Sequence, residues 1–417
     1  MKRILLSLLM LVALTSLQAQ RKKTLPKPVL PDMTVEEALA KYDFPSAELL
    51  INNEIATLKK AKQPTFEQEA KLQWLRKAQI KLNAVERVSF IDSLIVPRNE
   101  VLKSIHLSPE CGTLHNYSDF FHKTDTMDCT VFKSQLGDQI FFSQADEQSN
   151  ISLYNCDIYG DNSISTPTIL DGISDNEGSQ NYPFVMTDGT TIYFAAQGTE
   201  SLGGYDIFMS RYDPDEHRFL SPENIGMPFN SPANDYLYVI DEFNNLGWFV
   251  TDRNTSGDSV CIYIFIPNEI RQVYVPEELG ADTLRSFARI NRISDTWQDE
   301  LAVRAAQFRL RALKASTEEK ENAEFDFIVT DNQIYHKTTD FRNESARNQV
   351  GIWLQTRKQL KEIQQQLALK RKEYPNTLPS QRENIKEEIL SLETNEERLF
   401  NQVKRLEKEI RKAELGL

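Results

Sequence analysis

The stretch from Asn181 to Arg211, NYPFVMTDGTTIYFAAQGTESLGGYDIFMSR, decides the fold of the β-rich part of the chain. Asp188-Gly189 lies between two apolar runs, and tight hairpin turns favour these residues because they tolerate a positive φ. The β-branched and aromatic run Ile192–Ala195 predicts a strand. Gly203-Gly204 then interrupts the chain, and Tyr205–Phe208 predicts another strand. The stretch therefore predicts a small antiparallel sheet.

Two further stretches have the same form of an aromatic strand, a polar loop and a second strand. They are Gly137–Phe142 with Ile151–Tyr154 upstream, and Leu246–Val250 with Cys261–Phe265 downstream. Phe194 lies 52 positions after Phe142 (194 − 142) and 55 positions before Phe249 (249 − 194). A period of about 40–50 residues with several strands in each unit is typical of β-propeller blades.

The residues of the central copy also carry a family resemblance. Thr187–Phe194, Gly203–Phe208 and Asn224–Asp235 give a D-G turn, an aromatic strand, a Gly-rich stretch and an Asn-containing linker in that order. This order resembles the WD40-like repeat of TolB-type propellers, called PD40, which is common in cell-envelope proteins of Bacteroidetes. The resemblance covers roughly Ser108–Pro267. It implies a propeller-like interaction platform and no particular activity.

Three repeat units do not close a propeller ring, since rings have at least four blades. The alternatives are a diverged blade in Cys111–Ser134 or Pro267–Leu284, an open sheet covered by helices, and completion by a second chain. We favour a small or incomplete WD40-like β-propeller over residues 108–284, capped by the flanking elements, because an uncovered strand edge promotes aggregation.

The composition limits the classes of function. The 417 residues are enough for two or three domains, and 40% hydrophobic with 26% charged residues is typical of a soluble protein. The net charge of −13 argues against general nucleic-acid binding, which needs a basic surface.

The N-terminus has the pattern of a secretory signal peptide, predicted over residues 1–19. Lys2 and Arg3 precede the apolar run Ile4–Leu14, which is short for a membrane span. We expect cleavage after Ala19, with an uncleaved anchor as the alternative, and a flexible lead over residues 20–33. The mature chain is then expected in the periplasm, or peripheral to the outer membrane, with no transmembrane span.

The four cysteines are Cys111, Cys129, Cys156 and Cys261, and none belongs to a CxxC pair, which argues against a zinc site. In an oxidising compartment they can form disulfides. Cys111 with Cys129 is the most local choice among three complete pairings, and four buried free thiols are the alternative.

Residues 34–107 are predicted to form a helical region. Thr34 is a suitable N-cap. Apolar residues at helical spacing extend over Val35–Tyr42, Pro45–Lys62 and Phe66–Ile91, and the last helix is expected to bury Leu72, Leu75, Ile80, Leu82 and Val85. The region is similar in style to tetratricopeptide helices, so a partner-binding groove and a helical cap on the propeller are equal alternatives. Asp92–Leu107 is expected to be a strand or an extended linker.

Residues 285–343 are predicted to be a connector made of one helix and a β-hairpin. The helix is expected over Asp295–Ala315, with one apolar face made of Trp297, Leu301, Ala305, Phe308 and Ala312. A charged loop is expected at Thr317–Asn322. Phe325–Val329 and Gln333–Lys337 predict a hairpin, which would dock on the propeller or on a helix because two strands alone are marginally stable.

Residues 344–417 are predicted to form an antiparallel coiled-coil hairpin, Glu344–Lys372 against Ser380–Glu414. Spacings of four and three place one seam along the second helix, formed by Ile385, Ile389, Leu392, Glu396, Leu399, Val403, Leu406 and Ile410. Trp353, Leu360, Ile363 and Leu367 form a shorter seam on the first helix. Dimerisation through the coiled coil is the alternative, for which Glu396 in the seam is weak support.

Enzymatic motifs were sought along the whole sequence. No GxSxG nucleophile elbow, phosphate-binding loop or HExxH motif is present. His115 and His122 with Asp119 and Asp125 are a minor metal candidate. Two acidic loops are minor calcium candidates, Asp157 with Asp161 and Asn162, and Asp252 with Asn254 and Asp258. We therefore predict no enzyme, no cofactor, and no catalytic, cofactor-binding or metal residues.

The leading hypothesis is a non-enzymatic exported envelope scaffold. It would mediate protein–protein interactions through the propeller and the coiled coil, with an outer-membrane or secretion complex among its envelope partners. The alternative is a glycan- or peptide-binding propeller module. In that alternative, Tyr193, Tyr205, Tyr236 or Trp248 would stack on the ligand at the propeller's central face.

Overall fold

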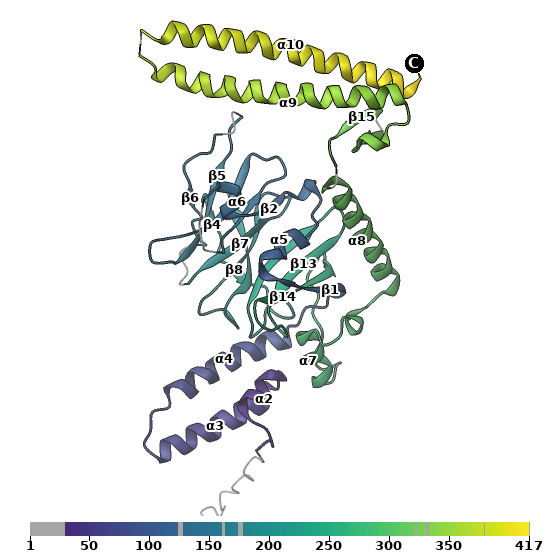
Figure 1. The fold of residues 1–417 in the computed structure, drawn as a ribbon. Helices are drawn as coiled ribbons and strands as arrows, with labels where there is room; N and C mark the ends of the chain where they lie inside the picture. Colours follow the sequence, from purple (N-terminus) through teal and green to yellow (C-terminus); the bar gives the residue numbers. More distant parts are fainter. Residues whose placement is uncertain are drawn as a thin grey trace, which may run out of the picture. The chain divides into compact units, whose positions relative to one another are not determined.

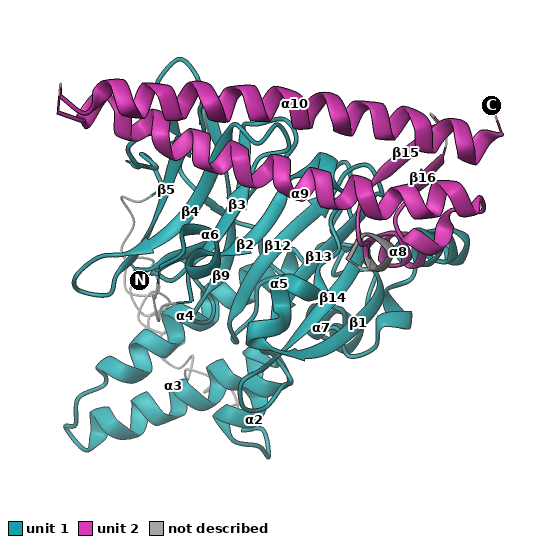
Figure 2. Ribbon diagram, turned by 45° about the horizontal axis from the view of Figure 1, so that its top comes forward, with its two compact units in different colours: residues 1–310 teal, residues 311–417 magenta. Residues whose placement is uncertain are grey.

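The computed structural model describes residues 30–123, 128–160, 163–173, 178–321, 323–330, 333–378 and 380–416. They fall into two compact units, one ending at Leu310 and the other beginning at Arg311 (Figure 2). The predicted signal peptide over residues 1–19 and most of the predicted lead lie outside the described residues. No helix in the described ranges is long and apolar enough to cross a membrane.

The first unit contains three antiparallel sheets (Figure 1). Their strands are β1 (Ser89–Pro97), β2 (Thr113–Asn116), β3 (Thr130–Lys133), β4 (Gln139–Ala145), β5 (Ile151–Asp157), β6 (Thr168–Ile169), β7 (Gln180–Val185), β8 (Thr191–Ala196), β9 (Asp206–Asp213), β10 (Arg218–Phe219), β11 (Glu223–Asn224), β12 (Asp235–Asp241), β13 (Leu246–Thr251) and β14 (Ser259–Ile266). The first sheet has the order β2-β3-β4-β5-β6. The second has the order β10-β9-β8-β7, with β11 also paired to β9, and the third has the order β1-β14-β13-β12.

Consecutive sheets pack against each other through β7 and β12. β7 contacts β3, β4 and β5 of the first sheet, and β12 contacts β7, β8 and β9 of the second. The chain is therefore a mixed α and β protein with several antiparallel sheets. The described residues show no closed ring, so the predicted propeller stays unconfirmed.

The three predicted copies occupy equivalent places in the three sheets. Phe142 in β4 pairs with Tyr154, Phe194 in β8 pairs with Phe208, and Phe249 in β13 pairs with Tyr263. Each pair is aromatic on both strands, and such cross-strand pairs stabilise a sheet. The strands predicted for all three copies are thus confirmed.

The two segments in which a diverged fourth blade was one alternative do not form one. Residues 111–134 supply β2 and β3 to the first sheet, and residues 267–284 contain only an isolated bridge at Val273 and the start of helix α7 (Ala281–Arg289). The last strand of the third sheet comes instead from far upstream, because β1 pairs with β14 from Ser89–Ile266 to Pro97–Ser259. The prediction of a strand or an extended linker over Asp92–Leu107 is confirmed only as far as Pro97, because Arg98–Glu100 and α5 (Val101–Ser104) are helical.

Three helices precede the sheets, α2 (Val35–Ala40), α3 (Phe44–Lys60) and α4 (Phe66–Asn83). Thr34 and Glu37 form a reciprocal capping box at the start of α2, as expected for an N-cap threonine. The prediction that the third helix continues to Ile91 is wrong, since α4 ends at Asn83 and Ser89 begins β1. Ile80 is also 66% exposed, whereas Leu72, Leu75, Leu82 and Val85 are buried as expected.

The connector helix differs from its prediction in both bounds and orientation. Helix α8 (Glu300–Glu321) begins after Trp297, and it includes most of the segment predicted to be a charged loop. Leu301 and Phe308 are 76% and 67% exposed, while Val303, Ala306 and Leu310 are the buried side chains. The predicted apolar face is therefore not the packed face.

The second unit is a helical hairpin with a docked β-hairpin. Helix α9 (Glu344–Glu373) packs antiparallel to α10 (Arg382–Leu415), which confirms the predicted hairpin (Figure 1). Glu396 in the seam accepts a hydrogen bond from Gln364 Nε2 on α9 at 2.9 Å, so the hairpin itself satisfies this carboxylate. The predicted β-hairpin forms from β15 (Phe327–Thr330) and β16 (Gln333–Tyr335). Its aromatic residues join a core with Trp353 and the seam residues of α10, as expected for docking on a helix.

The cysteines do not pair. Cys111, Cys129, Cys156 and Cys261 are all buried, and none of them forms a disulfide. The expected Cys111–Cys129 disulfide is therefore absent, and burial raises the pKa of the thiols of Cys111, Cys156 and Cys261.

We predict that Trp353→Ala destabilises the second unit by about 3–5 kcal/mol, because it removes a buried ring and leaves a cavity. Trp353 is 2% exposed, and its ring lies 5.5 Å from that of Phe325 and 5.1 Å from that of Phe327. Ile352→Ala is the matched control, since Ile352 is 53% exposed. Chemical denaturation followed by far-UV circular dichroism measures both. Equal losses in the two variants would contradict the packing described here.

Candidate functional site

The segments that carry the repeat resemblance meet where the second sheet passes to the third. Asp206 at the start of β9 accepts hydrogen bonds from the backbone N–H groups of Leu202-Gly203 at 2.9 and 3.1 Å, and from Asn224 Nδ2 at 2.7 Å. The side chain of Asn230 bonds to both backbone groups of Ile207, at 2.7 and 2.8 Å. The linker 224–235 is therefore fixed to the start of β9 by its amide side chains.

The Gly203-Gly204 pair makes this close approach possible. A Cβ atom at Gly203 would lie 1.7 Å from the carbonyl oxygen of Ala233, and one at Gly204 would lie 2.1 Å from Asn234 Oδ1. Asn234 Oδ1 in turn accepts the Tyr205 N–H at 3.0 Å. Side chains larger than glycine would push the linker away from the sheet. The pair that the sequence indicated as a strand break is thus a packing requirement.

The charged centre of this region is the ion pair between Asp235 and Arg253, whose side chains are almost completely buried. Arg253 Nη2 lies 2.8 Å from Asp235 Oδ1. The guanidinium also donates to the carbonyl oxygens of Pro228–Phe229 and to Thr251 Oγ1, and Asp235 accepts the Ser231 N–H at 2.7 Å and the Ser231 hydroxyl at 3.0 Å. A buried ion pair needs such additional bonds to offset its desolvation.

Asp206 titrates near neutral pH in this setting. Desolvation is the main cause and the charge of Asp235 adds to it, and together they raise the pKa of Asp206 from 3.8 to about 7. The donors of Leu202, Asn224 and Gly203 act in the opposite direction, because hydrogen bonds favour the ionised carboxylate.

Directly beside this region lies a groove of about 600 Å³, which we call the helix–sheet groove. Its walls come from α2, α3 and α4 on one side and from the loops of the second and third sheets and the end of α7 on the other. The lining residues are Leu39, Ala40, Tyr42, Ile51, Lys71, Trp74, Leu75, Leu202, Pro232, Ala233, Arg253, Asn254 and Arg289. The volume is in the range of small-molecule and peptide-anchor sites.

The helices and the sheets are joined firmly around this groove. Trp74 Nε1 donates to the carbonyl oxygen of Leu202 at 2.7 Å, and Lys77 Nζ lies 2.7 Å from Glu200 Oε1. The buried residues of α2–α4 share one apolar core with Leu202, Met227 and Leu284. The two alternatives for the N-terminal helices are therefore compatible, because the helices cap the sheets and still leave a groove.

The charged groups in the groove are all basic. They are Lys71, Arg253 and Arg289, and no carboxylate lies among the described lining residues. Arg253 is neutralised by Asp235. Lys71 and Arg289 form no ion pair or hydrogen bond with any described residue, and Arg289 is half-buried at the C-terminal end of α7. The groove therefore presents two uncompensated positive charges beside the rings of Tyr42 and Trp74.

Two of the four aromatic residues proposed for ligand stacking, Tyr236 and Trp248, are in the core instead. Trp248 is completely buried and Tyr236 nearly so, and Tyr193 and Tyr205 are half-buried. Arg98 lies 4.4 Å above the Tyr236 ring, and a cavity of about 20 Å³, enough for one water, adjoins them. Stacking on a sugar through Trp248 is therefore excluded by its burial.

The metal candidates are not assembled in the described part of the chain, where no group of three or more His, Cys, Asp or Glu side chains is placed to hold a metal ion. His115 bonds to Thr113, and Asp252 accepts hydrogen bonds from Asn234 and Tyr236. Asp125, Asp161 and Asn162 lie outside the described residues, so the candidates that include them were not tested by the geometry.

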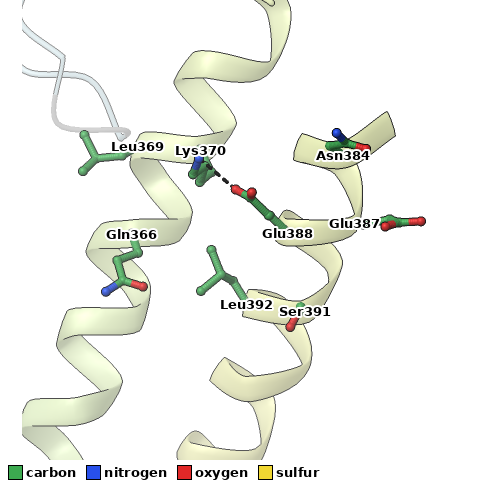
Figure 3. Close-up of a pocket in the computed structure, with 8 residues that line it drawn as sticks. All are labelled: Gln366, Leu369, Lys370, Asn384, Glu387, Glu388, Ser391 and Leu392. Atoms are coloured by element: carbon green, nitrogen blue, oxygen red, sulfur yellow. Dashed lines mark ion pairs between the residues drawn. The ribbon is translucent and has the colours of Figure 1, made fainter. Parts of the chain in front are cut away.

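A second hollow lies on the helical hairpin near its turn, and it measures about 740 Å³. Gln366, Leu369 and Lys370 come from α9, and Asn384, Glu387, Glu388, Ser391 and Leu392 come from α10 (Figure 3). Lys370 Nζ lies 2.8 Å from Glu388 Oε2, so the lysine of this hollow is paired across the two helices. It is a shallow groove between paired helices.

Comparison with protein-family models, curated proteins and solved structures gives no match for this chain. The resemblance to TolB-type repeats therefore depends on the residues of the central copy alone and stays a prediction. The function is therefore inferred from the fold and from the geometry of the candidate site.

Sequence patterns did not indicate the residues of the helix–sheet groove. Lys71, Arg253 and Arg289 come from three segments that only the fold brings together. The one available local signal was the Asn224–Asp235 linker motif, which places Pro232 and Ala233 at the groove.

We predict that Arg253→Met destabilises the first unit by about 3–5 kcal/mol, because it leaves the Asp235 carboxylate buried without its partner. The double variant Arg253→Met/Asp235→Asn should recover at least about 1 kcal/mol of this loss, since the Asp235 carboxylate is no longer left buried without its partner. Chemical denaturation of both variants measures the difference. Strictly additive losses would show that the two residues are not coupled.

We also predict a specific pH dependence from Asp206. Its folded-state pKa of about 7 lies above the ordinary 3.8, so its contribution to stability is complete below about pH 4. That contribution falls as pH rises and is lost above pH 7, by about 4 kcal/mol in total. As the pH rises from 4 to 8, the wild type should therefore lose stability relative to the Asp206→Asn variant. Parallel stability curves in thermal or chemical unfolding would refute this assignment.

Proposed function

We propose that this chain is a non-enzymatic scaffold of the bacterial cell envelope, exported to the periplasm, that mediates protein–protein interactions. In this proposal its three sheets are blades of a small, incomplete WD40-like propeller, and the helical hairpin is a second docking arm. Its partners would be envelope proteins, including those of an outer-membrane or secretion complex.

The observation that carries the proposal is the helix–sheet groove. It combines apolar walls from Leu39, Leu75 and Leu202 with two aromatic rings and a few polar groups, a pattern typical of recognition sites. Its floor is held by the buried Asp235–Arg253 pair, so its shape is preorganised. A preorganised groove of this kind suits an inserted segment of a partner protein.

The alternative of a peptide-binding module is contained in this proposal, because an inserted partner segment is a peptide. A glycan site built on stacking by Trp248 is not part of it, since that ring is buried.

The proposal predicts site-specific crosslinking from the groove. A photo-crosslinking residue at Asn254, on the exposed rim of the groove, should capture a defined envelope protein in intact cells, and one at Leu369 tests the hairpin. Ile95 on β1 is the matched control, because it is 66% exposed and lies outside both grooves. Mass spectrometry identifies the captured proteins. The same set of proteins from Ile95, or none from Asn254 and Leu369, would overturn the scaffold proposal.

A further inference from the structure

We infer that the helix–sheet groove binds an acidic partner segment, an extended peptide that presents Asp or Glu side chains beside large apolar ones. The inference rests on the proposed function and adds the chemistry of the bound segment. It depends on the sign of the charges in the groove, on their lack of partners and on the apolar walls between them.

The charged side chains of the groove are positive, whereas the net charge of the whole chain is negative. The chain has 61 acidic and 48 basic residues, yet the charged side chains that line the groove are Lys71, Arg253 and Arg289. A basic groove in an acidic protein attracts acidic ligands and repels basic ones. Charge complementarity therefore selects a negatively charged occupant.

Two cations close to the groove residues in sequence are paired, unlike Lys71 and Arg289. Arg285, one turn earlier on α7, lies 2.7 Å from Asp43 and 3.2 Å from Asp282. Lys77, on the same helix as Lys71, pairs with Glu200 at 2.7 Å. Arg289 and Lys71 have no such carboxylate among the described residues. Arg285 and Lys77 are thus neutralised within the fold, whereas Lys71 and Arg289 remain available to a ligand in the groove.

Arg289 is held where a ligand can meet it. It ends α7, and the next residue, Ile290, turns the chain with a left-handed φ of 53°. Tyr42, Arg253 and Arg289 line the same groove. Burial raises the pKa of the Tyr42 hydroxyl and the charge of Asp235 adds to this rise, whereas the charges of Arg253 and Arg289 and a hydrogen bond with the Ser231 side chain oppose it. A carboxylate bound here would meet the guanidinium of Arg289.

The apolar walls indicate that the ligand carries apolar side chains as well as negative charge. Leu39, Ala40 and Trp74 offer surface that an apolar side chain can cover, and burial of such surface supplies most of the affinity in peptide grooves. The chain's own Arg21–Pro31 stretch has four basic residues and no acidic one, so its charge is wrong for this groove. We therefore assign the groove to a segment of another protein.

Fluorescence anisotropy with the full mature chain tests the inference. The probe is a fluorescein-labelled peptide of alternating Asp and Leu residues, compared with an Asn–Leu peptide, a Lys–Leu peptide and an all-Asp peptide of equal length. We expect the Asp–Leu peptide to bind at least about tenfold more tightly than the others, with an affinity that falls as salt screens the charges.

Charge-removing variants locate the binding. Arg289→Gln and Lys71→Gln should each weaken the Asp–Leu peptide by about three- to tenfold and leave the weak binding of the Asn–Leu peptide unchanged. Arg76→Gln is the matched control, because Arg76 is an exposed cation on α4 that does not line the groove. Neither tested side chain forms an ion pair or a hydrogen bond with a described residue, so the variants should remain folded by circular dichroism.

The outcomes separate this inference from the proposed function. Equal binding of the Asn–Leu peptide, equal binding of the all-Asp peptide, or an equal effect of Arg76→Gln would overturn the acidic-segment inference. So would the absence of any binding to wild type. Each of these results leaves the scaffold proposal intact where Asn254 still captures a partner in cells, and failure of that capture overturns the proposal itself.

Discussion

The buried ion pair between Asp235 and Arg253 is the interaction on which the arrangement of the first unit depends. Asp235 begins β12, and Arg253 follows β13, so the pair joins both strands to the linker that enters the third sheet. Such a pair adds little net stability compared with apolar packing, but the removal of only one of its two members is strongly destabilising. The pair also forms hydrogen bonds with Ser231, Thr251 and the carbonyls of Pro228–Phe229. These bonds fix the path that the linker takes.

That path has two consequences on opposite sides of the linker. On the inner side, Asn230 and Asn234 bond to the start of β9, and Gly203-Gly204 make room for them. On the outer side, Pro232 and Ala233 line the helix–sheet groove. The repeat motif therefore specifies the junction between two sheets and one wall of the candidate site with the same few residues.

The sequence predicted those parts of the fold whose signals are local. The aromatic strands around Phe142, Phe194 and Phe249 and the seam of the helical hairpin follow from short periodic patterns, and both are confirmed. The end of α4 was predicted wrongly because Ser89–Pro97 is recruited by β14, which lies far along the chain. Periodicity also favoured the Leu301–Phe308 face of α8, while the packed face uses the smaller Val303 and Ala306. The groove could not be predicted, since its cations come from three distant segments.

The two hollows differ in a way that bears on recognition. In the hairpin, Lys370 pairs with Glu388 and Arg371 with Glu393 across the two helices, so these cations are neutralised within the unit. In the helix–sheet groove only Arg253 is neutralised, and it is the cation that the fold itself requires. Paired cations attract an acidic ligand weakly, whereas unpaired cations beside apolar walls discriminate by sign and by shape. Selective recognition is therefore expected at the groove, where Arg253 maintains the geometry and Lys71 and Arg289 are left free to read the partner's charge.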